Sequence, residues 1–319
     1  MNGLDRRPVG GTGLAVSALG IGGGSLANAK GSDALRALLD AAWDRGLRYF
    51  DTAALYAAGE SERRFGLGLR DRERDAFVLS TKLGRFIGAD GRDAFDYTAP
   101  GAERTLEGSL ERLGLGRVDI VFIHDLTPAL HGDAFDRQFR TCMDGAYPFL
   151  DGLRAQGIIR AVGVAMADAD TALQFAQAGR FDCFMLAGGY TLLRQASHRT
   201  LLAHCAAAGS TVMVAAPFNT GILATGSAPG ARLDYAPAPP DVLARVAAIE
   251  AVCRRHGVPL PAAALQFPLA HPAVGSVVAG HQAVAELDAN LRLLATPVPA
   301  AFWAELKETG LLPNDVPTP

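Results

Sequence analysis

The sequence predicts an α/β fold. It indicates one domain over residues 1–319, a closed (β/α)8 barrel of the TIM-barrel type with a short N-terminal β-hairpin and an extra C-terminal helix. Short apolar runs alternate with amphipathic helical patterns eight times along the chain. The runs lack an alternation of polar and apolar residues, which is typical of strands covered on both faces. No Ser/Gly-rich linker divides the 319 residues, and barrels of roughly this length occur as single domains.

The first half of the chain supplies the hairpin and four strand–helix units. The sequence "GGTG" lies between two short stretches within residues 7–16 and predicts the hairpin. Spacing places Leu106, Leu110 and Leu113 on one face of the third helix. We expect strands at 18–22, 47–51, 77–82 and 118–123, with helices at 33–45, 61–69, 99–113 and 147–156.

The second half repeats this scheme. Proline clusters at 237–240 and near the C-terminus predict loops. An amphipathic helix at 300–309 follows the last unit, and we expect its Trp303 to be buried against the barrel. The other elements are strands at 159–164, 183–186, 211–216 and 274–278, with helices at 168–178, 198–208, 241–256 and 283–294.

Composition and charge exclude several classes of function. Hydrophobic residues make up 49% and charged residues 20% of the chain, as in ordinary globular proteins. The net charge is −3 and no long basic run is present, so neither nucleic acid nor an anionic membrane is an expected partner. The first ten residues lack the apolar core of a signal peptide, and no run approaches the ~18 apolar residues of a membrane span. We expect a cytoplasmic protein and leave its oligomeric state open.

The cysteines do not indicate a disulfide framework or a metal centre. Cys142, Cys183, Cys205 and Cys253 are widely spaced and form no C-x-x-C pair, which is typical of reduced, buried thiols. Cys253 and His256 lie three residues apart, but a zinc site needs three or four ligands. We expect no metal.

The glycine-rich stretch "GIGGGS" at 20–25 raises a second possible fold, the doubly wound dinucleotide-binding fold. With Asp51 ending the next predicted strand, it has features of a dinucleotide-binding turn. That fingerprint must open a helix directly, whereas the helical pattern here begins only at about residue 33. The barrel is therefore favoured.

Polar residues end three consecutive predicted strands. Asp51 ends one strand with Tyr56 in the following loop, Lys82 ends the next, and His124 with Asp125 ends the third. Active sites of such barrels lie at the C-terminal ends of the strands. Singly, each residue fits a turn cap, a solvated rim or a structural histidine. Together, Asp51, Tyr56, Lys82 and His124 are expected to converge on one site.

This set of residues suits proton transfer to or from oxygen. A free phenol has a pKa near ~10, and a lysine held charged by Asp51 is expected to lower the pKa of Tyr56. Tyr56 could then exchange a proton with an alcohol or carbonyl, while His124 orients the substrate oxygen. Because no side chain supplies hydride, the matching oxidation or reduction at carbon requires a nicotinamide.

Four segments resemble the aldo-keto reductase superfamily: "FDTAALYAAGESERRFG", "VLSTKLG", "RTLEGSLERLGLGRVDIVFIHD" and "AAALQFPLAHPAVGSVVAG". The resemblance implies an NAD(P)-dependent oxidoreductase that binds its cofactor without a Rossmann fold. It implies Asp51, Tyr56, Lys82 and His124 as the catalytic tetrad, with Tyr56 as the acid/base. Within the superfamily, "MLAGGYTLLRQ", "FNTGILAT" and "YAPAP" are similar to the branch of D-threo-aldose 1-dehydrogenases, also called L-fucose dehydrogenases. L-galactose dehydrogenases and a pyridoxal 4-dehydrogenase are also similar.

The resemblance also implies a cofactor site. The family holds the pyrophosphate after strand seven and the adenosine after strand eight. Among the departures from the family pattern, one bears on the choice between NAD and NADP: Gln282 stands where relatives often carry an arginine for the 2′-phosphate. A phosphate monoester would then lack its charged partner, so NAD is favoured over NADP. The implied cofactor residues are Gly22, Gly23, Phe218, Asn219, Thr220, Gly221, Leu223, Gly280, Gln282, Glu286 and Asn290.

The expected activity is oxidation of the anomeric hydroxyl of an aldopyranose, such as L-fucose or a D-threo-aldose, to the lactone. Candidate residues for a small polar substrate are Asn28, Arg85 and Asp125, which lie in long predicted connections. One alternative is oxidation of pyridoxal or another small alcohol or aldehyde. A second, of a different class, is a non-catalytic nicotinamide-binding partner protein.

Overall fold

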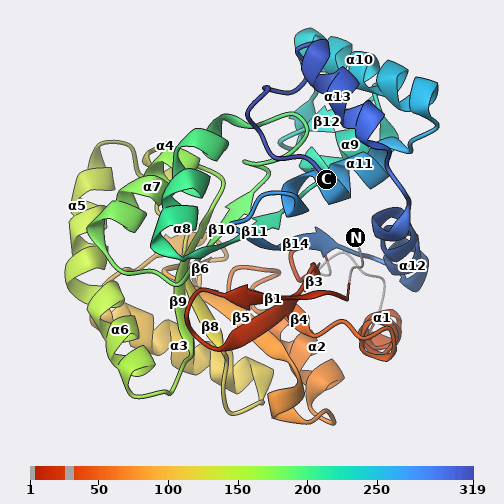
Figure 1. The fold of residues 1–319 in the computed structure, drawn as a ribbon. Coiled ribbons are helices and arrows are strands. Elements are labelled where there is room, and N and C mark those ends of the chain that lie inside the picture. Colours follow the sequence, from red (N-terminus) through yellow and green to blue (C-terminus); the bar gives the residue numbers. More distant parts are fainter. Residues whose placement is uncertain (1–3, 26–31) are drawn as a thin grey trace.

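Eight parallel strands close into a barrel in the computed structural model, which describes residues 4–25 and 32–319 (Figure 1). This confirms the predicted (β/α)8 fold. Around the barrel the strands follow the order of the chain, and the last pairs with the first. They are β3 (Leu19–Gly22), β4 (Tyr49–Asp51), β5 (Val78–Leu83), β8 (Ile120–His124), β9 (Ala161–Met166), β10 (Cys183–Ala187), β11 (Thr211–Ala215) and β14 (Val274–Gly280).

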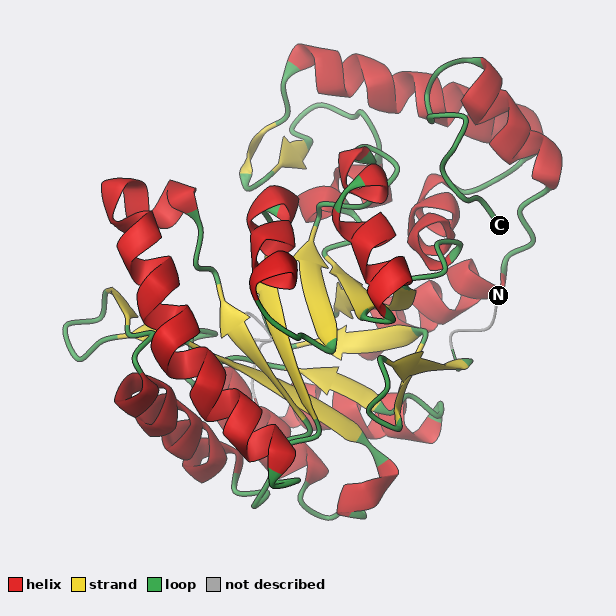
Figure 2. Ribbon diagram, turned by 60° about the vertical axis from the view of Figure 1, so that its left-hand side comes forward, coloured by secondary structure: helices red, strands yellow, loops and turns green. Residues whose placement is uncertain are grey.

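Helices surround the strands, so that the barrel is enclosed on its outer face (Figure 2). The layer between helices and strands forms the larger hydrophobic core, and a second cluster that includes Tyr49, Phe122 and Met213 fills the barrel interior. The helices that follow the eight strands are α1 (Ser32–Asp44), α2 (Glu60–Leu69), α3 (Ala99–Leu113), α6 (Tyr147–Ala155), α7 (Ala169–Ala178), α8 (Leu201–Ala208), α11 (Leu260–Leu269) and α12 (Val284–Ala295).

The predicted N-terminal hairpin is present as β1 (Arg6–Val9) and β2 (Leu14–Ser17). Its turn contacts the start of β11, where the Gly10 N–H donates a 2.9 Å hydrogen bond to Thr211 Oγ1. Gly10 has φ +50°, and a Cβ there would lie 2.9 Å from the backbone oxygen of Asp182. Glycine at this position therefore lets the hairpin approach the N-terminal ends of the strands closely.

One helix assignment from the sequence was wrong. The helix predicted at 241–256 exists as α10 (Pro240–His256), but it packs against α13 (Ala300–Glu308) at one end of the molecule (Figure 1). The unpredicted α11 packs against β14 and α12 instead. Nearly all of α11 is apolar and buried, so it lacks the amphipathic period by which surface helices are found.

Several connections that were expected as loops contain short elements. After β8 come α4 (Pro128–His131), α5 (Phe135–Thr141) and one turn of π-helix over Cys142–Ala146. Two small hairpins follow other barrel strands, β6 (Arg85–Ile87) with β7 (Asp93–Phe95) and β12 (Arg232–Leu233) with β13 (Ala236–Pro237). The short α9 (Ile222–Thr225) follows β11.

Two expectations about single side chains are confirmed. All four cysteines are buried with free thiols, and burial raises the pKa of Cys253 to about 11. Trp303 is 1% exposed and packs against Phe302 and Phe267. Within the described residues, no helix combines the length and apolar character needed to span a membrane.

Candidate active site

Three neighbouring strands bring the predicted tetrad together. Asp51 is the last residue of β4, Lys82 lies near the end of β5, and His124 is the last residue of β8. β4 pairs with β5 and β5 with β8, so the three ends are adjacent at the C-terminal edge of the barrel. Tyr56 lies in the turn between β4 and α2, where its N–H donates to the Ala53 oxygen.

A buried ion pair forms the base of the site. The Lys82 Nζ donates to Asp51 Oδ2 at 2.6 Å and to the backbone oxygen of Thr52 at 2.8 Å, and Lys82 is only 1% exposed. Burial alone would lower the pKa of Lys82, but the charges of Asp51 and Tyr56 outweigh it and raise that pKa above its ordinary value. Lys82 therefore stays protonated.

Sequence reasoning missed Ser80, whose side chain completes the hydrogen bonding of this buried ion pair. Its hydroxyl donates to Asp51 Oδ1 at 2.7 Å, so both carboxylate oxygens are occupied. The strand period of two could have revealed it, because Ser80 and Lys82 must point to the same face of β5. Thr81, between them, points outward and donates to Glu62 on α2.

Tyr56 lies against the lysine, with Nζ 4.7 Å from the centre of its ring. Lys82 acts on the pKa of Tyr56 in the expected direction, but the expected net lowering of that pKa was wrong. Burial raises that pKa, and the opposing charge of Lys82 does not offset it. The phenol is therefore protonated at neutral pH in the protein without its cofactor.

His124 faces Tyr56 edge-on, with ring centres 5.9 Å apart. Burial, with the positive charges of Lys82 and Arg85, lowers the pKa of His124 well below its ordinary value, so the imidazole is neutral. Its buried Nδ1 has no hydrogen-bond partner in the described structure. Nε2 lies 3.5 Å from a carboxylate oxygen of Asp125, which favours the tautomer that carries its proton on Nε2.

Two of the three predicted substrate residues also lie here. The Arg85 Nη1 donates to Asp125 Oδ2 at 2.7 Å, beside His124. Sequence reasoning missed Asp93, whose carboxylate binds the Arg85 guanidinium from the other strand of the β6–β7 hairpin. The third candidate, Asn28, lies outside the described residues.

The predicted cofactor residues lie at or after the ends of three further adjacent strands, β11, β14 and β3. Asn219, Thr220 and Gly221 all have positive φ in the turn after β11. After β14, Glu286 accepts a 2.7 Å hydrogen bond from the Gln282 N–H. Asn290 Nδ2 lies 3.0 Å from a ring nitrogen of His281, and Gly280 is the last residue of β14. After β11, the side chain of Phe218 is half-buried.

Not every predicted cofactor residue presents a side chain. Leu223 is fully buried in the core, so only its backbone could contact a ligand. Gly23 has a packing reason to be glycine, because a Cβ there would lie 2.5 Å from Ser61 Oγ and 2.9 Å from the Asp51 oxygen. At Gly22, a Cβ would lie 3.2 Å from Val278.

Buried polar atoms without partners show that these three strand ends suit a polar ligand. They include Ser25 Oγ after β3, Asn219 Oδ1 after β11 and His281 Nδ1 after β14, each unpartnered among the described residues. Such atoms are costly unless something satisfies them. Backbone N–H groups in turns of this kind bind phosphate readily, so the residues present fit a dinucleotide pyrophosphate.

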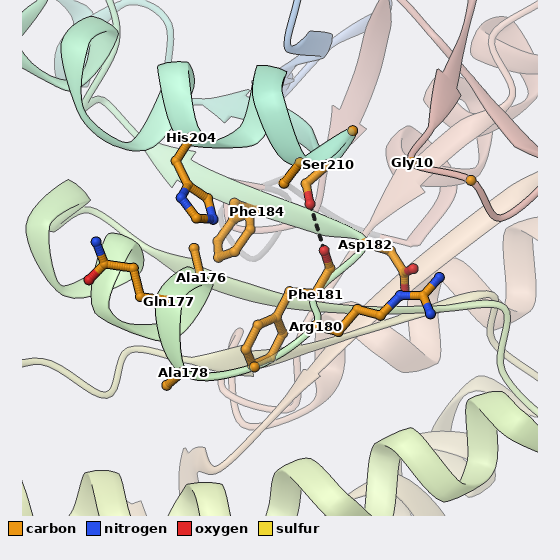
Figure 3. Close-up of a pocket in the computed structure, with 14 residues that line it drawn as sticks. Gly10, Ala176, Gln177, Ala178, Arg180, Phe181, Asp182, Phe184, His204 and Ser210 are labelled. Carbon is orange, nitrogen blue, oxygen red and sulfur yellow. Dashed lines mark hydrogen bonds between the residues drawn. The ribbon is translucent and has the colours of Figure 1, made fainter.

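A separate cavity of about 420 Å³ lies at the other end of the barrel (Figure 3). The turn of the N-terminal hairpin and the segments entering β10 and β11 line it, with His204 and Ser210 among the labelled residues. The Ser210 hydroxyl donates to the Phe181 oxygen across it. Because this end of such barrels serves stability, we place the candidate active site at the tetrad.

Comparison with known proteins finds dehydrogenases that match this chain over nearly its whole length. The chain is 37% identical to a D-threo-aldose 1-dehydrogenase of Pseudomonas sp. over 95% of this chain and 96% of the relative. It is 34% identical to a pyridoxal 4-dehydrogenase of Microbacterium luteolum, over 97% of this chain and 98% of the relative. An L-galactose dehydrogenase of Arabidopsis thaliana is 28% identical over 91% of this chain and 88% of the relative.

Among solved structures, the holo form of an aldo-keto reductase from Bacillus halodurans has the same fold. Its TM-score is 0.79, with 24% identity over 96% of both chains. The sequence profile of the aldo/keto reductase family matches residues 18–310. The chain therefore belongs to the aldo/keto reductase family, whose members are oxidoreductases that use NAD(P)H.

Proposed function

We propose that this protein is an NAD-dependent aldose 1-dehydrogenase. It oxidises the anomeric hydroxyl of an aldopyranose, such as L-fucose or a D-threo-aldose, to the lactone. The observation that carries the proposal is the contact of Tyr56 with a buried Asp51–Lys82 pair beside a neutral His124. The relatives named as D-threo-aldose 1-dehydrogenase and L-galactose dehydrogenase support a sugar substrate.

Each residue of the tetrad has one task in this reaction. His124 donates from Nε2 to the substrate oxygen and fixes its position. Tyr56, as the phenolate, takes the proton of the anomeric hydroxyl while the C–H bond breaks and the carbon–oxygen double bond forms. Lys82 stabilises the phenolate, and Asp51 keeps Lys82 charged. A bound nicotinamide supplies the hydride acceptor.

NAD is the proposed cofactor. Gln282 and Glu286 are both exposed after β14, and the Glu286 carboxylate binds the Gln282 N–H. A 2′-phosphate near these residues would meet a negative charge and no cation from this segment. Asn219, Thr220, Gly221 and the other predicted residues after β11 and β14 would hold the pyrophosphate and adenosine.

A second candidate activity is oxidation of pyridoxal through its hemiacetal. The 34% identity to a pyridoxal 4-dehydrogenase over nearly the whole chain favours it as the alternative. The hemiacetal also presents a ring hydroxyl to Tyr56, so the tetrad alone does not separate the two substrates.

The deciding assay is nicotinamide reduction with NAD and with NADP, each against L-fucose, D-arabinose, L-galactose and pyridoxal. We expect turnover of aldoses with NAD, rising through the alkaline range because the pKa of Tyr56 is raised and the phenolate is the base. Activity on pyridoxal alone would overturn the choice of substrate.

The variant Tyr56→Phe tests the mechanism. We expect a loss of roughly 10²-fold or more in kcat, with NAD binding retained, because the proton acceptor is gone. The control is Tyr235→Phe, since Tyr235 is 82% exposed. Unchanged turnover in Tyr56→Phe would refute the mechanism, whereas NAD binding by the wild type without turnover of any substrate would favour a binding protein.

A further inference from the structure

The carboxylate of Asp125 lies at the edge of the tetrad, and only one of its two oxygens accepts a hydrogen bond from the described residues. Oδ2 accepts from Arg85 Nη1 at 2.7 Å and lies 3.5 Å from His124 Nε2. Within the described part of the chain, no group donates a hydrogen bond to Oδ1. The side chain is 24% exposed, so this second oxygen borders solvent at the mouth of the site.

The position of Asp125 is fixed from two sides. Its N–H donates to the Ala165 oxygen at 2.9 Å, and its backbone has φ +49°, a left-handed conformation that costs free energy in a residue other than glycine. Arg85 is itself held by Asp93, because the guanidinium Nε donates to Asp93 Oδ2 at 3.0 Å. The carboxylate is therefore a preorganised acceptor.

His124 and Asp125 together present a donor and an acceptor side by side. Nε2 of the neutral His124 donates to the reacting oxygen of the substrate, as proposed above. The carboxylate 3.5 Å away is within reach of a hydroxyl on the next carbon, since neighbouring hydroxyls of a sugar are separated by about a hydrogen-bond length. Aldoses carry such a hydroxyl at C2.

We propose that Asp125 determines substrate specificity by accepting a hydrogen bond from the hydroxyl on the carbon next to the reacting carbon, with Arg85 holding the carboxylate in place. The inference rests on the proposed aldose dehydrogenase activity and narrows it to substrates with vicinal hydroxyls. Asp125 therefore recognises the substrate through this hydrogen bond and takes no proton in the reaction.

The test compares substrates that differ only in this hydroxyl. D-arabinose and 2-deoxy-D-ribose are one such pair, and L-fucose and 2-deoxy-L-fucose are another. A hydrogen bond to a charged group contributes about 1.5–3 kcal/mol, so wild-type kcat/KM should favour the hydroxylated sugar by roughly 10- to 100-fold. In Asp125→Ala the ratio should fall to about 1, because the acceptor is lost and the deoxy sugar loses nothing.

Two further variants keep the test decisive. Asp125→Asn retains the shape and a neutral acceptor, and its ratio should lie between those of the wild type and Asp125→Ala even where the alanine variant folds poorly. Asp136→Asn removes an exposed carboxylate from α5 and should keep the wild-type ratio. A wild-type ratio retained in both Asp125 variants would overturn the inference. Equal turnover of both sugars by the wild type would overturn the inference alone, and no aldose turnover would overturn the proposed function with it.

Discussion

Replacing Lys82 with methionine should expose the energetics of the ion pair at the base of the site. Lys82 and Asp51 are 1% and 2% exposed, and their 2.6 Å contact is shielded from water. Lys82→Met leaves a buried carboxylate without its cation, which costs about 3–5 kcal/mol. Asp51→Asn leaves a buried ammonium group and should cost a similar amount. The double variant has no uncompensated charge, so its loss should be smaller than the sum of the two single losses by about 2 kcal/mol or more.

Urea unfolding followed by circular dichroism measures these free energies, provided that the m-values of the four proteins agree. Lys307→Met, at a partly exposed position on α13, is the control and should change stability by less than about 0.5 kcal/mol. Additivity of the two single losses within about 0.5 kcal/mol would refute the reasoning, because it would mean that the two charges do not stabilise each other in the folded protein.

Three further predictions concern other parts of the chain. Burial lowers the pKa of His281 to about 4, so below pH ~6.5 the unfolded chain binds one proton more than the folded chain. The free energy of unfolding should therefore fall as the pH drops from ~6.5 to about 4, with a slope approaching ~1.4 kcal/mol per pH unit. His281→Gln should flatten this pH dependence by that amount in urea titrations. Gly66→Ala should destabilise the protein by about 1–3 kcal/mol or more, because the new Cβ would lie 1.9 Å from the Leu113 oxygen. Gly152→Ala in α6 should instead stabilise it by up to about 1 kcal/mol, because no atom lies within 4 Å of the new Cβ. Similar urea midpoints for the two variants would contradict this. Gln282→Arg should raise the kcat/KM ratio of NADP to NAD by roughly 10- to 100-fold, and an unchanged ratio would show that this position does not meet the 2′-phosphate.

The barrel and the meeting of the tetrad could be predicted because both depend on local patterns. Parallel strands in a closed sheet end at the same edge, so Asp51, Lys82 and His124 needed only the strand order to be placed together. The apolar, non-alternating strands were enough to indicate that order.

Features that depend on burial and tertiary contacts could not be predicted from such sequence patterns. The sequence shows a lysine that can lower the pKa of Tyr56, but not the desolvation that outweighs it. The almost wholly apolar α11 has no amphipathic period, so the preceding α10 was taken for the barrel helix. The Arg85–Asp93 contact depends on an unpredicted hairpin that pairs their two strands.

The Asp51–Lys82 pair has a further consequence, for chemoselectivity. A neutral lysine amine is a nucleophile and condenses with carbonyl groups to form a Schiff base. Here Asp51 and Tyr56 raise the pKa of Lys82, so its nitrogen carries a third proton and has no lone pair to offer. A carbonyl compound can therefore come close to this amine without forming an imine with it. The contact with Asp51 thus keeps the candidate site closed to imine chemistry.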